Sequence, residues 1–344
     1  RFQHRPARAR SAMRNVCVVS NMAGLRAAFE ARGLTGLRWL EGPLDTAEAK
    51  SALSSCEVLI GEPASCAPLV DGCSNLVWLQ STFAGCNQLT TGSNRRDYTV
   101  TRLAGCFGPD MAEYASLHIL AHERMYEEQR NLQRHSEWLA PRSLEGKLQG
   151  GANYRRLSSL TLGILGAGDI GNEIARTAAH GLRMNVVGLR RNPSPRESDA
   201  TCGFSRVFGI DELPTFLSQC DHIVSVLPST PATRGMLDGG VLQVCAARQA
   251  QLINVGRGDL LSESSIVEAV DRGWLSRYVG DVFAPEPLDA QSLLWKHPKV
   301  TVTPHNAAIT TPDDVVGAFE QNLDRFEAGG VAALQNVFDW EAGY

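Results

Sequence analysis

Short apolar runs alternate with amphipathic stretches along the first hundred residues of the chain. Runs rich in Val, Leu and aromatic residues predict strands, whereas residues 22–33 and 46–56 carry apolar residues at helical spacing. An alternation of strands and helices is typical of a parallel sheet covered by helices. The strands expected between residues 14 and 104 are NVCVVS, GLRWL, CEVLI, NLVWLQ and YTVTRL.

The second half of the chain repeats this alternation with more strongly apolar runs, which fit a sheet covered on both faces. A long helical pattern precedes them and begins at Pro109 and Asp110, so residues 109–131 are expected to form one helix. Residues 311–330 predict a final amphipathic helix, and Pro and Gly in residues 139–159 predict a loop. The strands expected are LTLGIL, MNVVGL, SRVFG, HIVSVL, AQLINV, SRYVGDV and KVTVT.

Composition narrows the class of protein. The chain has 344 residues, 43% hydrophobic and 20% charged, which is enough for two globular domains. The net charge of −4 argues against nucleic acid as a partner, and no apolar run reaches the roughly 18 residues of a membrane helix. The nine cysteines include no CxxC pair and no Cys/His ligand spacing. We therefore expect free, buried thiols in a reducing compartment and no metal site.

The first residues have an unusual composition: residues 1–14 contain five arginines and no acid, and the first acid is Glu30. One interpretation is a mitochondrial transit peptide, which would place the protein in the matrix. The other is that Met13 is the true start, which would make the protein cytoplasmic. The strand-like RNVCVVS directly after Met13 favours the second interpretation. In either case we expect residues 1–13 to be a disordered leader outside the fold.

A glycine-rich turn follows the strand expected at residues 160–165. In GILGAGDIG, Gly166, Gly168 and Gly171 have the GxGxxG spacing, and a helical pattern follows them. The first glycine permits the tight turn, the second lets the backbone approach a pyrophosphate, and the third packs the helix against the strand. Glycine-rich turns are common, but the strand before this one and the helix after it favour a dinucleotide-binding site.

Two arginines occupy the place where a dinucleotide-binding protein usually has an acid. That acid lies about 20 residues beyond the glycines and accepts hydrogen bonds from the ribose. Nineteen residues after Gly171 stands Arg190, followed by Arg191, and no acid lies between residues 186 and 192. A guanidinium can instead bind a 2′-phosphate through charge-assisted bonds. We therefore expect NADP(H) to be preferred over NAD(H), the alternative being that both arginines are solvated turn residues.

Four reactive side chains lie at or after the ends of expected strands: Arg257, Asp281, Glu286 and His305. Ligands of open α/β sheets bind beyond the carboxyl ends of the strands, so these side chains can converge. A histidine can protonate a developing alkoxide, a nearby carboxylate favours its imidazolium form, and a guanidinium can bind a substrate carboxylate. Each residue alone has an ordinary structural interpretation. Together, on strands that follow a phosphate-binding turn in the sequence, the four residues indicate hydride transfer to a 2-keto acid.

These motifs resemble those of the D-isomer-specific 2-hydroxyacid dehydrogenase family from residue 14 onward. The resemblance rests on GILGAGDIG, VLPSTPATRGML, LINVGRGDLL, GDVFAPEPL and TPHNAA. MAEYASLHIL, LWKHPKVTVTPH and the terminal GY are most similar to the glyoxylate/hydroxypyruvate reductase A group. The resemblance implies that Arg257, Glu286 and His305 are catalytic, with Arg257 also holding substrate. It further implies a substrate carboxylate bound by the backbone amides of Ala84 and Gly85, within LQSTFAGCNQL.

The same resemblance implies the cofactor site. Asp281 would hold the nicotinamide carboxamide. The chain departs from the family pattern at Asn306, directly after His305, where many members have an aliphatic residue. The other cofactor-binding positions implied are Gly166, Gly168, Asp169, Ile170, Gly171, Arg190, Arg191, Leu227, Pro228, Thr233 and Val255.

The resemblance also implies an α/β fold of two Rossmann-like parallel-sheet domains. A dinucleotide-binding domain, residues 109–308, would be inserted into a flavodoxin-like substrate domain made of residues 14–108 and 309–344. The helix at 109–131 would join two subunits in a homodimer, although its amphipathic pattern alone fits a core-packing helix equally well.

The function expected is NAD(P)H-dependent reduction of small 2-keto acids, such as glyoxylate or hydroxypyruvate, to D-2-hydroxy acids, with His305 as the acid/base. Two alternatives stay open: a non-enzymatic, dinucleotide-sensing co-repressor-like protein, and a phosphoglycerate dehydrogenase-type enzyme. A low-complexity extension would favour the first, and a basic cluster beside the substrate loop would favour the second. The sequence contains neither a low-complexity extension nor a basic cluster beside the substrate loop. Formate is disfavoured because Glu286 is an acid where formate dehydrogenases of this superfamily carry an amide.

Overall fold

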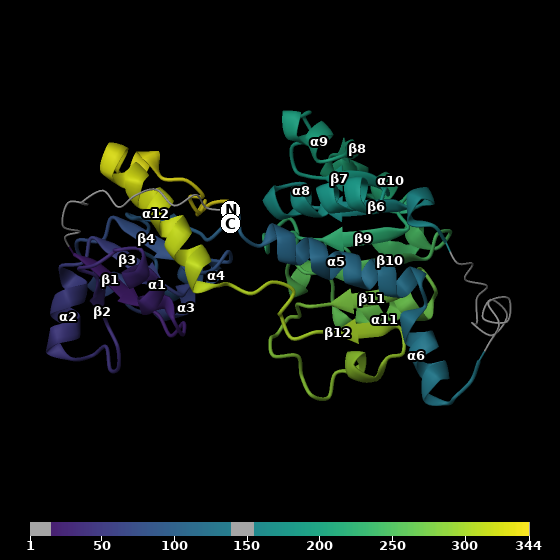
Figure 1. Cartoon of the computed structure of the whole chain (residues 1–344), viewed down its shortest axis with the longest axis horizontal. Helices are drawn as coiled ribbons and strands as arrows, with labels where there is room; N and C mark the ends of the chain where they lie inside the picture. Colours follow the sequence, from purple (N-terminus) through teal and green to yellow (C-terminus); the bar gives the residue numbers. More distant parts are fainter. Residues whose placement is uncertain (1–14, 139–154, 344) are drawn as a thin grey trace. The chain divides into compact units, whose positions relative to one another are not determined.

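The computed structural model describes residues 15–138 and 155–343. They form two compact units (Figure 1): one runs to Cys106 and resumes at Thr310, and the other is Phe107–Ile309. The junctions expected from the sequence lie at 108/109 and 308/309. The expected leader at 1–13 and most of the loop expected at 139–159 lie outside the described residues.

The first unit is built on a five-stranded sheet in the order β2-β1-β3-β4-β5. Every neighbouring pair is parallel, and the order 2-1-3-4-5 is that of flavodoxin. Strands β1, β3 and β4 are buried along their whole length, as their apolar runs predict. The elements are β1 (Val16–Val19), α1 (Leu25–Ala31), β2 (Arg38–Trp39), α2 (Ala47–Ser54), β3 (Val58–Gly61), α3 (Pro63–Cys66), β4 (Trp78–Ser81), α4 (Asn87–Gly92), β5 (Thr99–Thr101) and α12 (Pro312–Gly329).

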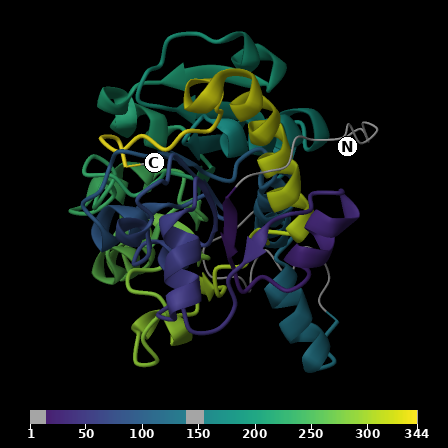
Figure 2. The same cartoon turned by 90° about the vertical axis from the view of Figure 1, so that its left-hand side faces the viewer.

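Helix α12 belongs to the first unit although about 200 residues separate it from β5. It begins at a capping box, in which the Thr311 hydroxyl accepts from the Asp314 backbone N–H and the Asp314 carboxylate accepts from the Thr311 N–H. Its buried face includes Phe319, which stacks on Trp78 at a ring-centroid distance of 5.3 Å. Figure 2 shows α12 in yellow beside the purple elements of this unit, where it packs against α1.

The second unit has a seven-stranded, wholly parallel sheet in the order β12-β11-β10-β9-β6-β7-β8. Counted within the unit, this is the Rossmann order 3-2-1-4-5-6 with a seventh strand added. The predicted fold class is therefore confirmed. The elements are α5 (Gly108–Glu123), α6 (Tyr126–Arg134), β6 (Thr161–Leu165), α8 (Asp169–Arg176), β7 (Asn185–Leu189), α9 (Glu197–Thr201), β8 (Phe204–Phe208), α10 (Leu213–Ser218), β9 (His222–Ser225), β10 (Ala250–Asn254), α11 (Glu263–Asp271), β11 (Leu275–Gly280) and β12 (Val300–Val302).

Helices cover both faces of this second sheet. Successive side chains of a strand point to opposite faces, and on β10 Leu252 belongs to one apolar cluster while Ile253 belongs to another. The Leu252 cluster includes side chains of α10 and α11, and the Ile253 cluster includes side chains of α5 and α8. This double coverage is why the strands carry the unbroken apolar runs seen in the sequence.

The prediction of one helix over residues 109–131 is wrong. Helix α5 ends at Glu123, and Met125 takes up a left-handed conformation with φ 50° before α6 begins. The Arg124 carbonyl accepts from the Gln129 side-chain amide at 2.5 Å, and the Arg124 guanidinium donates to the Arg155 carbonyl at 3.1 Å. The break carries neither Gly nor Pro, so tertiary contacts at this turn produce it rather than a local signal. Figure 1 shows α6 leaving the direction of α5.

Candidate active site

The glycine-rich turn joins β6 to α8, and its three glycines have different surroundings. Gly166 has φ +109°, which favours glycine, and its N–H donates to the Leu189 carbonyl at 2.9 Å. A Cβ on Gly168 would meet no atom within 4 Å, so this side of the turn is open. A Cβ on Gly171 would lie 2.1 Å from the Gly166 carbonyl oxygen, so only glycine lets α8 approach the turn this closely. These are the features that a pyrophosphate-binding turn requires.

The next two expected cofactor residues begin α8. Asp169 is exposed in the first turn of the helix, and Ile170 packs against the apolar cluster under it. The N–H groups of this first turn have no partners within the helix, which suits an anionic group beside the turn.

The two arginines after β7 differ in their surroundings. Arg191 is exposed, whereas Arg190 is only 6% exposed. The Arg190 guanidinium binds the Asp199 carboxylate through two bonds, of 2.6 and 2.8 Å, and these bonds hold the pKa of Asp199 below its usual value. The sequence led us to expect both guanidinium groups to face a phosphate. The structure differs for Arg190, because its guanidinium is buried inside the loop and bonded to Asp199.

The segment after β9 carries three more expected cofactor residues. Thr233 is 9% exposed, and its hydroxyl donates to the Pro228 carbonyl at 2.6 Å, which closes the turn. A Cβ on Gly256 would lie 2.6 Å from the Leu227 carbonyl oxygen, so the end of β10 packs directly against this turn. Val255 is buried next to Gly256 and contributes to the apolar core.

Arg257 follows β10 and is partly buried. The Asn254 side chain holds the backbone of this turn, because its amide donates to the Arg257 carbonyl at 2.9 Å. A Cβ on Gly258 would lie 2.0 Å from the carbonyl carbon of Phe283. The turn that carries Arg257 is therefore packed against the backbone of the segment that carries Glu286.

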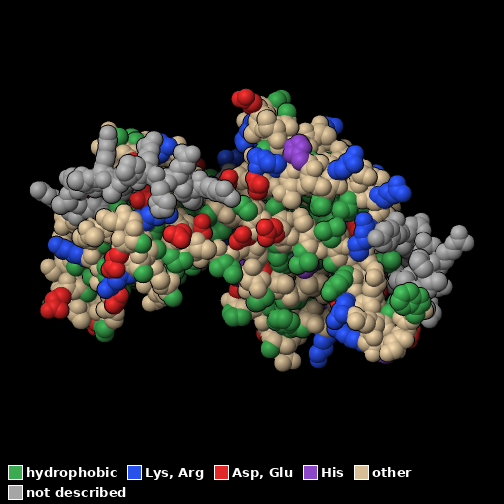
Figure 3. All heavy atoms as spheres, in the orientation of Figure 1, with side chains coloured by type: hydrophobic (Ala, Val, Ile, Leu, Met, Phe, Trp, Pro, Cys, Tyr) green, Lys and Arg blue, Asp and Glu red, His purple; other side chains and the backbone are tan. Residues whose placement is uncertain are grey.

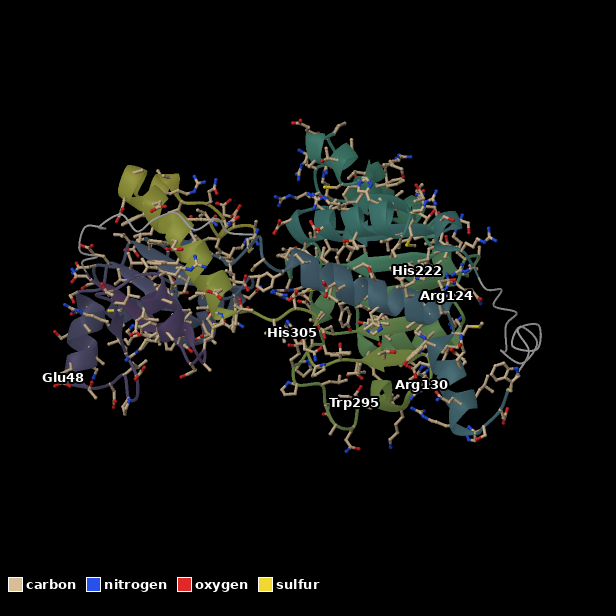
Figure 4. The ribbon with its side chains drawn as sticks, in the orientation of Figure 1. Glu48, Arg124, Arg130, His222, Trp295 and His305 are labelled. Carbon is tan, nitrogen blue, oxygen red and sulfur yellow. The ribbon has the colours of Figure 1, made fainter. Side chains whose placement is uncertain are left out.

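Glu286 and His305 form a directly bonded pair. The Glu286 Oε2 lies 2.8 Å from His305 Nδ1, and Glu286 Oε1 accepts from the Phe283 N–H at 2.8 Å. A carboxylate only accepts, so Nδ1 carries the proton of this bond and Nε2 is the nitrogen left for a reactant. The His305 side chain is 53% exposed. Figure 4 shows it at the end of the sheet opposite to His222, which begins β9.

Asp281, which is 1% exposed, holds the segment that carries His305. Its carboxylate accepts from the backbone N–H groups of Asn306 and Ala307, each at 2.9 Å, and its carbonyl accepts from the His305 N–H at 2.9 Å. The Thr303 hydroxyl donates to the same carboxylate at 2.5 Å. These bonds hold His305 at φ 54°, a left-handed conformation that costs a non-glycine residue about 1 kcal/mol or more.

Ala84 and Gly85 lie in the other unit, between β4 and α4, and both are partly buried. The Ser81 hydroxyl shapes this turn by accepting from the Phe83 N–H at 3.0 Å and donating to the Phe83 carbonyl at 2.8 Å. The second unit thus brings Arg257, Glu286, His305 and Asp281 together, whereas the expected substrate amides belong to the first.

A family model described as D-isomer specific 2-hydroxyacid dehydrogenase, NAD binding domain, matches residues 116–307. The glyoxylate/hydroxypyruvate reductase A of Serratia proteamaculans (strain 568) is 34% identical over 235 residues, which are 68% of this chain and 68% of that protein. The chain belongs to the D-isomer specific 2-hydroxyacid dehydrogenase family. It is an NAD(P)-dependent 2-hydroxyacid dehydrogenase, and its sequence is similar to those of glyoxylate/hydroxypyruvate reductases A.

Solved structures agree with this assignment. A family member from Aeromonas salmonicida has a TM-score of 0.80 and 35% identity, over 95% of this chain and 99% of that one. An NADPH-dependent glyoxylate/hydroxypyruvate reductase from Sinorhizobium meliloti, in complex with NADP and sulfate, has a TM-score of 0.81 and 26% identity, over 96% and 99%. These relatives favour the dehydrogenase over the dinucleotide-sensing alternative.

The curated relative from Serratia proteamaculans and a second glyoxylate/hydroxypyruvate reductase A, from Enterobacter sp. (strain 638), are both bacterial, so the mitochondrial interpretation of residues 1–13 gains no support. Within residues 15–138 and 155–343, no helix combines the length and the apolar character needed to cross a membrane.

Sequence reasoning missed three side chains of this dehydrogenase. Asp199 binds Arg190, Thr303 binds Asp281, and the Tyr114 hydroxyl lies 2.7 Å from Thr303 Oγ1. Burial raises the pKa of Tyr114 to about 12. Thr303 is the first residue of the TPHNAA motif, so the motif itself is a signal for it in the sequence. Tyr114 is 189 residues away from Thr303 and has no local signal.

Proposed function

We propose that this dehydrogenase reduces small 2-keto acids of the glyoxylate/hydroxypyruvate type to D-2-hydroxy acids, with NADPH preferred over NADH. The observation that carries the proposal is the bonded Glu286–His305 pair, held on a clamped segment beside the turn of Arg257.

In this proposal His305 is the acid/base. Glu286 accepts from Nδ1, which fixes the ring and stabilises its protonated form, and Nε2 then donates its proton to the developing alkoxide oxygen. In the oxidative direction Nε2 takes that proton back. The exposure of His305 supports this role, because a substrate can reach the ring.

Arg257 would bind the substrate carboxylate, and the Ala84 and Gly85 amides would contribute further donors. The support for Arg257 is its partly buried position on a turn whose backbone is fixed by Asn254. Its guanidinium also donates to the Gly256 carbonyl at 2.6 Å, and a held guanidinium loses less freedom when it binds a carboxylate.

The open side of Gly168 and the close approach at Gly171 fit a dinucleotide, which supplies the hydride when it is bound. Asp281 is nearly buried, and its Oδ1 already accepts two bonds, so Oδ2 would be the atom available to a carboxamide. The residues that would hold the cofactor are Gly166, Gly168, Asp169, Ile170, Gly171, Arg191, Leu227, Pro228, Thr233, Val255 and Asp281.

The cofactor preference is tested by measuring kcat/KM for NADPH and NADH separately during glyoxylate reduction, from the loss of absorbance at about 340 nm. A preference for NADPH of about tenfold, or about 1.4 kcal/mol, is expected if a guanidinium binds the 2′-phosphate. Equal use of the two cofactors would refute the preference and leave the reaction class intact.

The acid/base role is tested with His305→Ala, matched to His297→Ala. His297 is a suitable control because it also pairs with a carboxylate, with Nε2 3.1 Å from Asp271 Oδ1. His305→Ala should lower turnover by about 100-fold or more and leave NADPH binding unchanged, whereas His297→Ala should retain turnover. Equal turnover in the two variants would remove His305 from the mechanism.

We further propose a homodimer through α5 and α6. The described face of α5 exposes Leu117 and Leu120, at 61% and 37%, and Tyr126 of α6 is 53% exposed. Figure 3 shows apolar side chains on this face. A Leu117→Glu/Leu120→Glu double variant should sediment as a monomer. Val244→Glu, at another exposed apolar residue of this unit, should sediment as the unchanged protein does; an unaltered double variant would exclude this interface.

A further inference from the structure

Arg190 is a buried cation whose side chain joins the loop after β7 to helix α9. Its Nε donates to the Asn192 carbonyl at 2.8 Å, and one Nη donates to the Ser194 carbonyl. The guanidinium also binds both oxygens of the Asp199 carboxylate. One side chain thus ties two backbone carbonyls of residues 191–196 to the helix that follows them.

The same carboxylate closes the far end of this loop. Asp199 Oδ2 accepts from the Arg196 N–H at 2.9 Å, and the Asn192 side chain accepts from the Ser194 N–H at 3.0 Å. A Cβ on Gly209 would lie 3.4 Å from the Pro193 ring, so the loop also rests on the segment after β8. Residues 191–196 are therefore held at both ends and at their middle.

This loop lies next to the glycine-rich turn. Leu189, the residue before Arg190, accepts at its carbonyl from the Gly166 and Ala167 N–H groups, at 2.9 and 3.1 Å. Two arginines, Arg191 and Arg196, are exposed on the loop, while the charge of Arg190 is balanced by Asp199. The positive charge that can reach a ligand here comes from the two exposed arginines.

A buried ion pair seldom adds net stability, because desolvating both charges offsets their attraction. The pair instead fixes the shape of the loop, because the planar guanidinium binds its four acceptor atoms in one set geometry. Side chains on a fixed loop bind a ligand with less loss of freedom than side chains on a loop that must be ordered first.

We infer that Arg190 is a positioning residue and not a phosphate ligand. Together with Asp199 it shapes residues 191–196 so that Arg191 and Arg196 bind the 2′-phosphate of the dinucleotide. This inference rests on the proposed preference for NADPH and states which residues produce it. One consequence distinguishes this inference: binding of the anionic 2′-phosphate should depend on Asp199, although Asp199 is itself negatively charged.

The test measures the dissociation constants of NADPH, NADH and adenosine 2′,5′-bisphosphate by titration calorimetry on the full-length chain. Asp199→Asn keeps the shape of the side chain and removes one negative charge. If Arg190 were a phosphate ligand, this variant would release it and tighten NADPH binding. If Arg190 positions the loop, Asp199→Asn weakens NADPH and the bisphosphate by about fivefold or more, because misplaced groups lose most of their effect.

Companion variants separate the roles. Arg191→Met should weaken NADPH by about tenfold or more and leave NADH unchanged. Arg190→Lys keeps the charge but loses the planar fork, so it should weaken NADPH about as much as Asp199→Asn, and the double variant should be no worse than either single one. Arg206→Gln is the matched control. It removes the exposed ion pair between Arg206 of β8 and Glu212, and it should leave the affinities for NADPH and NADH unchanged.

Each outcome has a separate meaning. NADH affinity and the melting temperature report whether each variant is folded. A wild-type protein that binds NADPH and NADH equally would overturn the preference and this inference together. A wild type that prefers NADPH, with unchanged or tighter NADPH binding in Asp199→Asn, would overturn the positioning role alone.

Discussion

Replacing Thr303 by Val removes one hydroxyl and leaves the side-chain shape intact, so any effect comes from hydrogen bonds. The hydroxyl has one proton, which it donates to Asp281 at 2.5 Å, so the Tyr114 hydroxyl must donate to Thr303 at 2.7 Å. The bond to the buried carboxylate contributes about 1.5–3 kcal/mol, and leaving the partly buried Tyr114 hydroxyl unpaired costs about 1 kcal/mol. Thr303→Val should therefore lower the free energy of unfolding by about 2.5–4 kcal/mol.

The effect should also reach the reaction, because Asp281 holds the Asn306 and Ala307 N–H groups that fix the segment of His305. We expect kcat for keto-acid reduction to fall by about tenfold. The assays are urea unfolding followed by circular dichroism and steady-state kinetics. Thr301→Val, two residues earlier on β12, is the matched control; Thr301 lines a cavity together with His118 and Arg277.

A double-mutant cycle with Tyr114→Phe sharpens this prediction. Removing the Tyr114 hydroxyl from the Thr303→Val protein eliminates the unpaired group, so the two changes should cost about 1 kcal/mol less together than the sum of the single changes. Strict additivity, or a Thr303→Val protein whose stability and kcat match those of Thr301→Val, would refute the reasoning.

Three further predictions concern other parts of the second unit. Gly171→Ala should cost about 1–3 kcal/mol of stability and weaken NADPH binding, because its Cβ would lie 2.1 Å from the Gly166 carbonyl; an unchanged urea midpoint would contradict this. Glu286→Gln keeps a polar group next to His305 but removes the charge, so kcat of reduction should fall by about tenfold or more while calorimetry finds the same NADPH affinity. Burial, with a smaller effect from the charge of a neighbouring histidine, lowers the pKa of His122 from 6.5 to about 4. Protonation therefore favours the unfolded chain, and up to about 3 kcal/mol of stability is lost as the pH falls from 6.5 to 4. Urea midpoints across this range should vary less in His122→Gln, and equal variation would contradict the assignment.

The strand runs predicted both sheets because strands covered on two faces are apolar along their length, and that composition is visible in one dimension. The same was true of the glycine-rich turn, where the spacing of Gly166, Gly168 and Gly171 is set by local backbone geometry. The strand order was reached through the family resemblance, since periodicity cannot say which strands are neighbours. The break at Met125 was missed because neither Gly nor Pro marks it. The structure instead shows the neighbouring Arg124 bonded to Arg155 and Gln129, and these contacts are not visible in the sequence.

The site divides in the same way. The sequence by itself determined the chemistry: a histidine, a carboxylate and a guanidinium after successive strands, behind a phosphate turn, in a chain with two arginines in place of an acid. Only the tertiary structure decided the roles of groups that look alike in sequence. Arg190 and Arg191 are adjacent and identical in type, yet one is buried with Asp199 and the other is exposed. Thr303 and Tyr114 are 189 residues apart and share one hydrogen bond. The physical reason is that residue type and spacing fix what a side chain can bind, whereas burial and partners, which come from packing distant segments together, fix what it does bind.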